Sequence, residues 1–166
     1  QITDPNGDSQ SYRYDASGDL RSHTDALGVE ERYSYNGSHG LISITDGRGN
    51  TILTNSFDGD GRVSATFDAA GNRTGYQHDL VARTSVVTDP RGQEYFFAYD
   101  ERGNVIRSAD ALGNESISTY DEAGNVTSHT NPLGEVTRFE YDEHNRETRR
   151  SNGEGHASNY SYDASG

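Results

Sequence analysis

Aromatic residues recur along the chain at a nearly constant interval, with polar residues between them. Successive positions lie 21 residues apart, except for one interval of 22 residues. These anchor positions are Tyr14, Tyr35, Phe57, His78, Tyr99, Tyr120, Tyr141 and Tyr162. A period of 20 to 50 residues is typical of an array of one supersecondary unit. The pattern therefore predicts that residues 1–166 form a single array of seven to eight units, as a fragment of a larger protein.

Alternation around each anchor predicts β-strands. Six units carry another aromatic residue two positions before the anchor, at Tyr12, Tyr33, Tyr76, Phe97, Phe139 and Tyr160. Aliphatic residues stand six positions after five of the anchors, at Leu20, Leu41, Val63, Val105 and Val126. Aromatic and β-branched residues with period 2 indicate strands, whereas no sustained 3.6-residue period indicates a helix.

Two turns separate the strands of each unit. The anchor is followed by Asp or Asn, two variable residues and usually Gly, as in "YDASG", and a second motif such as "TDALG" begins ten residues after the anchor. Asp and Asn side chains bond backbone N–H groups two residues on, and Gly accepts a positive φ. The remaining residues form two strands of six or seven, so we predict an all-β fold of tandem 21-residue antiparallel β-hairpins.

The single 22-residue interval places one extra residue in the stretch "GNTILTNS". An inserted residue in a strand turns every following side chain to the other face unless a bulge absorbs it. We therefore predict a β-bulge within residues 50–56.

Composition alone favours disorder, since Leu, Ile, Val and Phe make up only 26 of the 166 residues and the net charge is −13. The regular phase of the aromatic residues outweighs this, because a disordered chain has no reason to keep it. The acidic balance disfavours nucleic acid and anionic membranes as partners. Cysteine is absent, which excludes disulfides and thiolate metal sites, and no apolar run is long enough to span a membrane.

The stretches "SYRYDASGDLRSHTDALG" and "RFEYDEHNRETRRSNGEG" carry a pattern that resembles the YD repeat of Rhs proteins. That repeat is similar to those of teneurins and of the shell subunits of Tc toxins. The resemblance implies a β-sheet that spirals into a shell, or cocoon, around a cargo such as a C-terminal toxin. It implies the remaining repeats and the cargo as partners, and a secreted or exported bacterial protein, delivered by a contractile secretion system or held at the cell surface.

Local departures from the repeat predict irregular second, fourth and seventh units. His39 and Asn145 stand where the turn Gly is usual, and Glu147 replaces the apolar residue. In the fourth unit His78 replaces Tyr, and "HDLVAR" lacks the turn Gly.

Residues with chemical potential are scattered. The six His residues do not accompany a G-x-S-x-G nucleophile motif, and the calcium-like stretch "DGDGR" places Arg62 at a ligand position. Rhs proteins can carry a self-cleavage site beyond the repeats, but no part of this chain matches that region. We therefore predict no catalytic, cofactor-binding or metal-binding residue, and we assign the anchors a structural role.

Three functions remain open at this point. A section of an encapsulating shell is the first, and a carbohydrate-binding or cell-surface-binding repeat module, in which Tyr rings stack on sugars, is the second. An enzyme built from the available His and Asp is the third. Exposure of the Tyr rings distinguishes the first two, because a sugar-binding Tyr must present an open ring face.

Overall fold

The computed structural model describes residues 2, 3, 5 and 7–163. The chain divides into two compact units, residues 1–76 with 89–91 and residues 77–88 with 92–166. Every regular element of the described residues is a strand, which confirms the predicted all-β class. No helix within the described part is long and apolar enough to cross a membrane.

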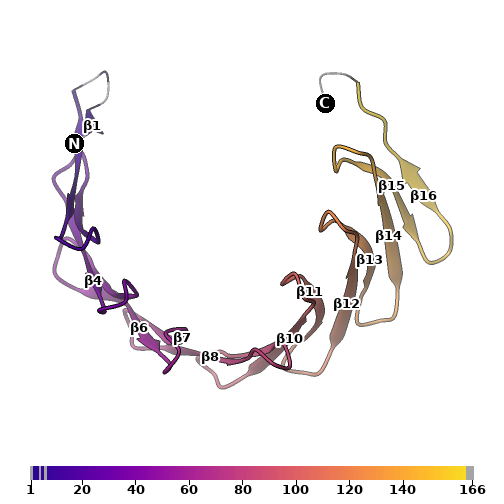
Figure 1. Ribbon diagram of the computed structural model, residues 1–166, viewed down its shortest axis with the longest axis horizontal. Coiled ribbons are helices and arrows are strands. Elements are labelled where there is room, and N and C mark those ends of the chain that lie inside the picture. The colour runs from indigo at the N-terminus through magenta and orange to yellow at the C-terminus, as the bar shows by residue number, and fades with distance from the viewer. Residues whose placement is uncertain (1, 4, 6, 164–166) are drawn as a thin grey trace. The chain divides into compact units, whose positions relative to one another are not determined.

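Sixteen strands are present in the described residues, and Figure 1 shows them following one another along the chain. The first unit contains β1 (Ile2–Thr3), β2 (Ser9–Tyr14), β3 (Leu20–Thr24), β4 (Glu30–Tyr35), β5 (Leu41–Thr45), β6 (Thr51–Phe57) and β7 (Val63–Asp68). Strand β8 (Arg73–Asp79) begins in the first unit and ends in the second. The second unit contains β9 (Thr84–Thr88), β10 (Glu94–Tyr99), β11 (Val105–Ala109), β12 (Glu115–Tyr120), β13 (Val126–Thr130), β14 (Val136–Tyr141), β15 (Glu147–Asn152) and β16 (Ala157–Asn159).

Consecutive strands pair antiparallel in both units, so the order in the sheet is the order of the sequence. Turns after the anchors therefore lie along one edge of the sheet, and turns of the second motif lie along the other. We call these the anchor edge and the second edge. Successive turns of the chain alternate between the two edges, so each edge repeats one kind of turn.

Register separates the side chains of the sheet into two faces. Tyr12 lies opposite His23 and Tyr14 lies opposite Leu20, so anchors, their aromatic neighbours and the aliphatic positions share one face. We call it the aromatic face. The other face carries small and charged side chains, such as Ser34 opposite Ser43. The predicted alternation thus places aromatic and aliphatic residues on a common surface.

A bulge recurs in six of the anchor hairpins, immediately beside the anchor. Tyr14 pairs with Leu20 but Arg13 pairs with Ser22, which leaves Arg21 as an extra residue. The same shift occurs beside Tyr35, Phe57, Tyr99, Tyr120 and Tyr141. Because the extra residue reverses the alternation of the second strand, the sequence-based strand pattern is correct only up to the bulge.

The predicted irregularity in residues 50–56 is confirmed as an additional bulge. Thr51 pairs with Thr45 and Leu53 pairs with Ile44, so Ile52 is the unpaired residue. The corresponding pair β11–β12 runs without a shift, from Ala109 opposite Glu115 to Arg107 opposite Ile117. The bulge at Ile52 therefore absorbs the one extra residue of the 22-residue interval.

The sheet has very little interior. Ala65 is the one buried apolar side chain in the described residues. Three polar side chains, those of Ser22, Ser85 and Ser151, are also buried. Most anchors and their aromatic neighbours between Tyr33 and Tyr141 are half-buried. Stability must therefore come largely from hydrogen bonds between neighbouring hairpins and from partial burial, as in other repeat arrays.

Candidate functional site

Every regular turn is closed by the Asp or Asn that begins it. In the first anchor turn, Asp15 Oδ1 accepts hydrogen bonds from the N–H groups of Ser17 and Asp19, at 2.9 and 3.0 Å. The backbone adds a bond from Gly18 N–H to the Asp15 carbonyl oxygen and one from Asp15 N–H to the Asp19 carbonyl oxygen. Gly18 has φ of 89°, a conformation that a side chain disfavours. The motif is thus a self-contained turn that orders its own backbone.

The second and seventh anchor turns keep this geometry without Gly. His39 and Asn145 adopt φ of 64° and 61°, and their N–H groups make the same backbone bond as Gly18. Asn36 Oδ1 accepts from the N–H groups of Ser38 and Gly40. The prediction of irregular second and seventh turns is therefore wrong, since Asn and His tolerate the left-handed region.

The fourth anchor turn does depart, as predicted. Positive φ falls on Arg83, one residue later than usual, and Asp79 Oδ1 accepts from the N–H groups of Val81 and Ala82. Strand β9 pairs with β10 from Thr84 onward, and Tyr99 N–H bonds the Arg83 carbonyl oxygen. This turn exposes Leu80 and Val81 to solvent.

Asn side chains at the fifth position of five turns bind the opening carboxylate as well. Asn114 Nδ2 donates to Asp110 Oδ2 at 2.8 Å, and the equivalent bonds join Asn50 to Asp46, Asn72 to Asp68, Asn104 to Asp100 and Asn125 to Asp121. These Asn hydrogen bonds, with the backbone N–H bonds, hold the pKa of each of the five carboxyl groups below its usual value. The ionised form is therefore part of the folded turn.

Acidification should therefore weaken the fold. A carboxyl group with a lowered folded-state pKa contributes stability above its unfolded value, about 3.9 for Asp, and loses it as pH falls through the folded value. We expect the thermal midpoint, followed by circular dichroism, to stay level from pH 7 to about 5 and to fall below about pH 4. Asp110→Asn should reduce that fall, because Asn131 already makes the same backbone bonds in its turn. A midpoint that rises on acidification would contradict this role.

Three anchor tyrosines bind the preceding unit through their hydroxyl groups. Tyr120 Oη donates to the Val105 carbonyl oxygen at 2.8 Å, and Tyr141 Oη donates to that of Val126 at 3.0 Å. Tyr162 Oη makes the same bond to Glu147 at 2.7 Å. Each acceptor lies directly before the bulged residue of its strand, where the regular ladder is interrupted. The anchor thus ties its unit to the one before it.

At Phe57, an anchor without a hydroxyl, a neighbouring side chain makes this link. Phe57 cannot donate, and Asn55 Nδ2 on the same face donates to the Leu41 carbonyl oxygen at 3.0 Å. Thr66 Oγ1 donates to Asn55 Oδ1 at 2.9 Å and holds that amide in place. No such hydroxyl bond is present for Tyr35 or Tyr99 in the described structure. The tie is therefore common to both units but not universal.

Tyr141→Phe should destabilise the second unit by about 1 kcal/mol, the usual net value of one hydrogen bond, because it leaves the Val126 carbonyl oxygen without this donor. Burial raises the pKa of the Tyr141 hydroxyl, so it remains a donor at neutral pH. Urea unfolding measures the change. Tyr35→Phe is the control, and it should have a smaller effect because Tyr35 makes no such bond. Equal effects of the two variants would contradict the tie.

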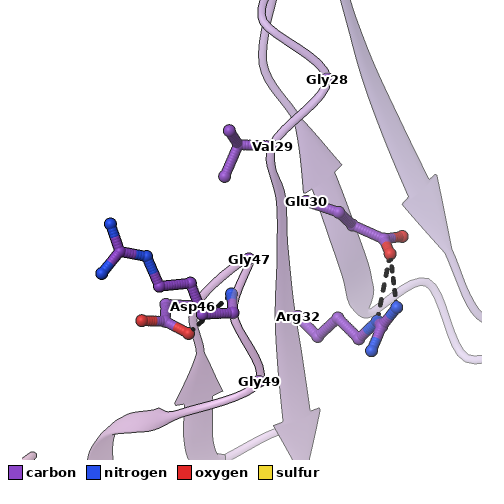
Figure 2. A pocket seen from close by; sticks show the side chains of 8 residues that line it. Gly28, Val29, Glu30, Arg32, Asp46, Gly47 and Gly49 are labelled. Atoms are coloured by element: carbon purple, nitrogen blue, oxygen red, sulfur yellow. Dashed lines mark hydrogen bonds and ion pairs between the residues drawn. The ribbon is translucent and has the colours of Figure 1, made fainter.

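Two equivalent hollows lie on the second edge of the described part of the chain. Figure 2 shows the first, where Val29 points into the space beside Gly47 and the ion pair of Glu30 with Arg32 lies on the other side of its strand. A Cβ at Gly47 would collide with Val29 Cγ1. The second hollow lies beside Gly153, and the two have volumes of about 620 and 640 Å³. Both hollows are wide open to solvent. We interpret each as the space that the missing side chain of Gly47 or Gly153 leaves beside the preceding turn.

The His residues make separate local contacts. His23 stacks on Tyr12 with ring centroids 4.8 Å apart, His129 bonds Ser118, and His78 bonds the buried Ser85 at 2.9 Å. His39 reaches Asp19 of the preceding anchor turn at 2.8 Å. No group of three or more His, Asp and Glu residues in the described part of the chain could hold a metal ion.

The calcium-like stretch is also used locally. Arg62 donates to Asp58 Oδ2 at 3.0 Å and to Asp60 Oδ2 at 2.5 Å, while Asp58 Oδ1 accepts from two backbone N–H groups of its turn. Both carboxylates are therefore engaged by the turn and by Arg62. The predicted anchor residues lie together along the aromatic face of each unit rather than around a pocket.

Comparison with known proteins identifies the repeat. The RHS Repeat family matches residues 14–51 and 120–157, and both segments begin at an anchor. Comparison with curated protein sequences gave no significant match.

Solved structures of Tc toxin proteins share the fold. They include the TcdB2-TccC3-Cdc42 crystal structure (TM-score 0.66, 17% identity), the TcdB2-TccC3-TEV crystal structure (TM-score 0.67, 17% identity) and the Photorhabdus luminescens Tc holotoxin pore (TM-score 0.65, 18% identity). Each alignment covers 90% of this chain and 9% to 10% of the other chain. This chain therefore spans about a tenth of the length of the chains that it matches, and it resembles a fragment of their sheets.

Proposed function

This chain is a segment of RHS repeats, and on that premise we propose that it is one section of a shell that encloses a C-terminal toxin or another passenger domain. The passenger and the remaining repeats of the shell are its partners. The host protein is a secreted or exported bacterial protein. The role of the segment is to form part of the shell wall. Its repeat-anchor residues have a structural role in that wall.

The observation that carries this proposal is the way in which successive units are joined. Hydrogen-bonded strand pairs connect neighbouring hairpins, and the anchor hydroxyls of Tyr120 and Tyr141 add a bond to the preceding unit. Pairing each hairpin with the next satisfies strand edges that would otherwise remain open. A sheet of this kind can extend by any number of units, which is what a wall requires.

The thin sheet suits a wall better than a catalyst. A catalytic site of this kind holds a nucleophile, a base and a positioning group within hydrogen-bonding distance of one another, and it excludes water. The His residues here each bind a different local partner, such as Ser118 for His129. We therefore propose that the segment supplies no catalytic residue, and that any activity of the host protein resides in the passenger.

Electron cryomicroscopy of the full-length protein tests this proposal. We expect density for the passenger on one side of a continuous sheet that includes residues 1–166. A passenger domain that lies outside the sheet, connected only by a linker, would exclude the shell function.

The partial exposure of the tyrosine side chains on the aromatic face supports carbohydrate binding as a second candidate. Tyr33 and Tyr99 are half-buried and lie on this face, where a sugar ring could stack. A glycan array with the wild-type protein and the Tyr33→Ala and Tyr99→Ala variants tests it. Binding that both substitutions abolish while circular dichroism stays unchanged would favour the glycan function, and no binding by the wild-type protein would eliminate it.

A further inference from the structure

Three turns in the described part of the chain open with Asn instead of Asp, and they differ in the residue that follows. Asn36 precedes Gly37, Asn131 precedes Pro132 and Asn152 precedes Gly153. In each turn the Asn Oδ1 accepts hydrogen bonds from two backbone N–H groups, as the Asp carboxylate does elsewhere. The three turns therefore share their geometry, and the next residue decides their chemistry.

The side-chain amide of Asn36 is folded back over its own backbone. Its Oδ1 accepts from the N–H groups of Ser38 and Gly40, at 2.9 and 2.8 Å. The first bond closes a ring that contains both Asn36 Cγ and the backbone nitrogen of Gly37, so these two atoms stay near each other. Both N–H donors also stabilise negative charge on Oδ1, which develops when a nucleophile adds to Cγ.

The two reacting groups of this pair are free. The Gly37 N–H makes no hydrogen bond within the described residues, and no atom lies within 4 Å of the place where a Cβ of this exposed glycine would stand. Asn36 Nδ2 likewise has no hydrogen-bond partner in the part of the chain that the structure describes. By contrast, Asn152 Nδ2 donates to His156 Nδ1 at 3.4 Å, which holds the corresponding amide in its turn.

We propose that Asn36 is a self-modification site, at which the turn converts its own asparagine to aspartate or isoaspartate. The Gly37 nitrogen loses its proton and attacks Asn36 Cγ. A bond between that nitrogen and Cγ forms, and the bond from Cγ to Nδ2 breaks. Nδ2 leaves with the proton as ammonia, and a five-membered succinimide ring remains. Water then opens the ring, so the net change consumes water, releases ammonia and involves no oxidation or reduction.

The two products differ in their effect on the hairpin of β4 and β5. Water that breaks the new bond to Cγ gives aspartate, the residue that opens the same turn at Asp15. Water that breaks the backbone bond of the ring gives isoaspartate, whose longer main chain disrupts the hydrogen bond between Asn36 N–H and the Gly40 carbonyl oxygen. The site thus adds negative charge to the turn with age and opens the turn in some molecules. This chemistry does not depend on the proposed shell function.

Two other turns show which features the reaction needs. Pro132 has no N–H, so it cannot supply the attacking nitrogen beside Asn131. Gly59 has an N–H but follows Asp58, whose carboxyl pKa is lowered by hydrogen bonds from the backbone and side chain of Arg62. The ionised carboxylate resists attack by a nucleophile. Asn36 with Gly37 combines a neutral amide with a free N–H.

Isotope labelling of the full-length protein tests the site. The folded protein is kept in water enriched in heavy oxygen, and its peptides are followed by mass spectrometry, since the label enters at a carboxyl group that forms during the incubation. We expect label at position 36 to rise with time in the folded protein, while the Asn131 peptide stays unlabelled. Label at position 36 in urea-unfolded protein alone would overturn the proposal, because the turn would then protect the amide.

Two substitutions at Gly37 separate this route from simple hydrolysis of the amide. Gly37→Pro removes the attacking N–H, and the turn accepts Pro at this position, as Pro132 shows. It should abolish labelling at Asn36. Gly37→Ala keeps the N–H but crowds it with a methyl group, and Ala16 occupies the same position of the first anchor turn, so labelling should slow several-fold. Circular dichroism checks that both variants fold. Undiminished labelling in either folded variant would overturn the proposal.

Discussion

Deletion of Ile52 should leave the protein folded, whereas deletion of Ile117 should unfold the hairpins around β12. Ile52 is the unpaired residue of a bulge, so its removal lets Thr51 and Leu53 continue the ladder with β5. Ile117 pairs with both Arg107 and Thr130. Its removal moves the following side chains, including Tyr120, to the other face of the sheet.

The two deletions form a matched pair. Both remove an exposed isoleucine from a strand, with 37% and 47% exposure, so the loss of apolar contact is similar. Thermal unfolding followed by far-UV circular dichroism compares them, and hydrogen exchange locates the damage. We expect a near-native midpoint without Ile52, and a large drop with loss of protection in β11 to β13 without Ile117. Equal damage would mean that the bulge at Ile52 is not where the extra residue is absorbed.

Gly61→Ala should destabilise the first unit by about 1 to 2 kcal/mol, because a Cβ disfavours the left-handed region. Gly61 has φ of 81° and closes the turn that begins at Asp58. Gly59 lies in the same turn without a positive φ, and a Cβ there would meet no atom within 4 Å. Gly59→Ala should therefore be neutral, or stabilise by about 0.4 to 1 kcal/mol through the unfolded chain.

Urea unfolding of the two variants separates two effects on stability: the strain of a left-handed backbone and the lower flexibility of the unfolded chain. The comparison is matched because both substitutions add one methyl group to the same turn. Midpoints shifted in opposite directions, or a shift in Gly61→Ala alone, support the turn geometry. Equal shifts would show that the conformation at Gly61 does not control stability.

The repeat period, the strands, the turns and the bulge near Ile52 were all predictable from the sequence, because each depends on local residue types with a fixed spacing. The recurring bulge beside the anchor was not. The extra residues include Arg21, Ile42 and Thr127, which share no property that a sequence pattern could detect. What these residues share is their position, directly after the residue that pairs with the anchor.

Irregular turns show a similar limit. The absence of Gly led us to predict irregular turns at His39 and Asn145, yet both residues adopt the left-handed conformation, and each also contacts the preceding anchor turn. The fourth turn was predicted correctly because it lacks a residue suited to positive φ at the usual place. The hydroxyl bond of Tyr141 could not be foreseen either, since its acceptor is a backbone atom exposed by the bulge.

Limited proteolysis of the full-length protein tests the shell function most directly. One form is intact, and the other lacks residues 15–162, which are seven whole intervals between anchors, so the remaining repeats keep their phase. The cleavage rate of the passenger is measured in both forms, with the isolated passenger as the unprotected reference. The shell function predicts slow cleavage in the intact protein and a rate close to that of the reference after the deletion. Equal rates in the intact and shortened proteins would contradict it.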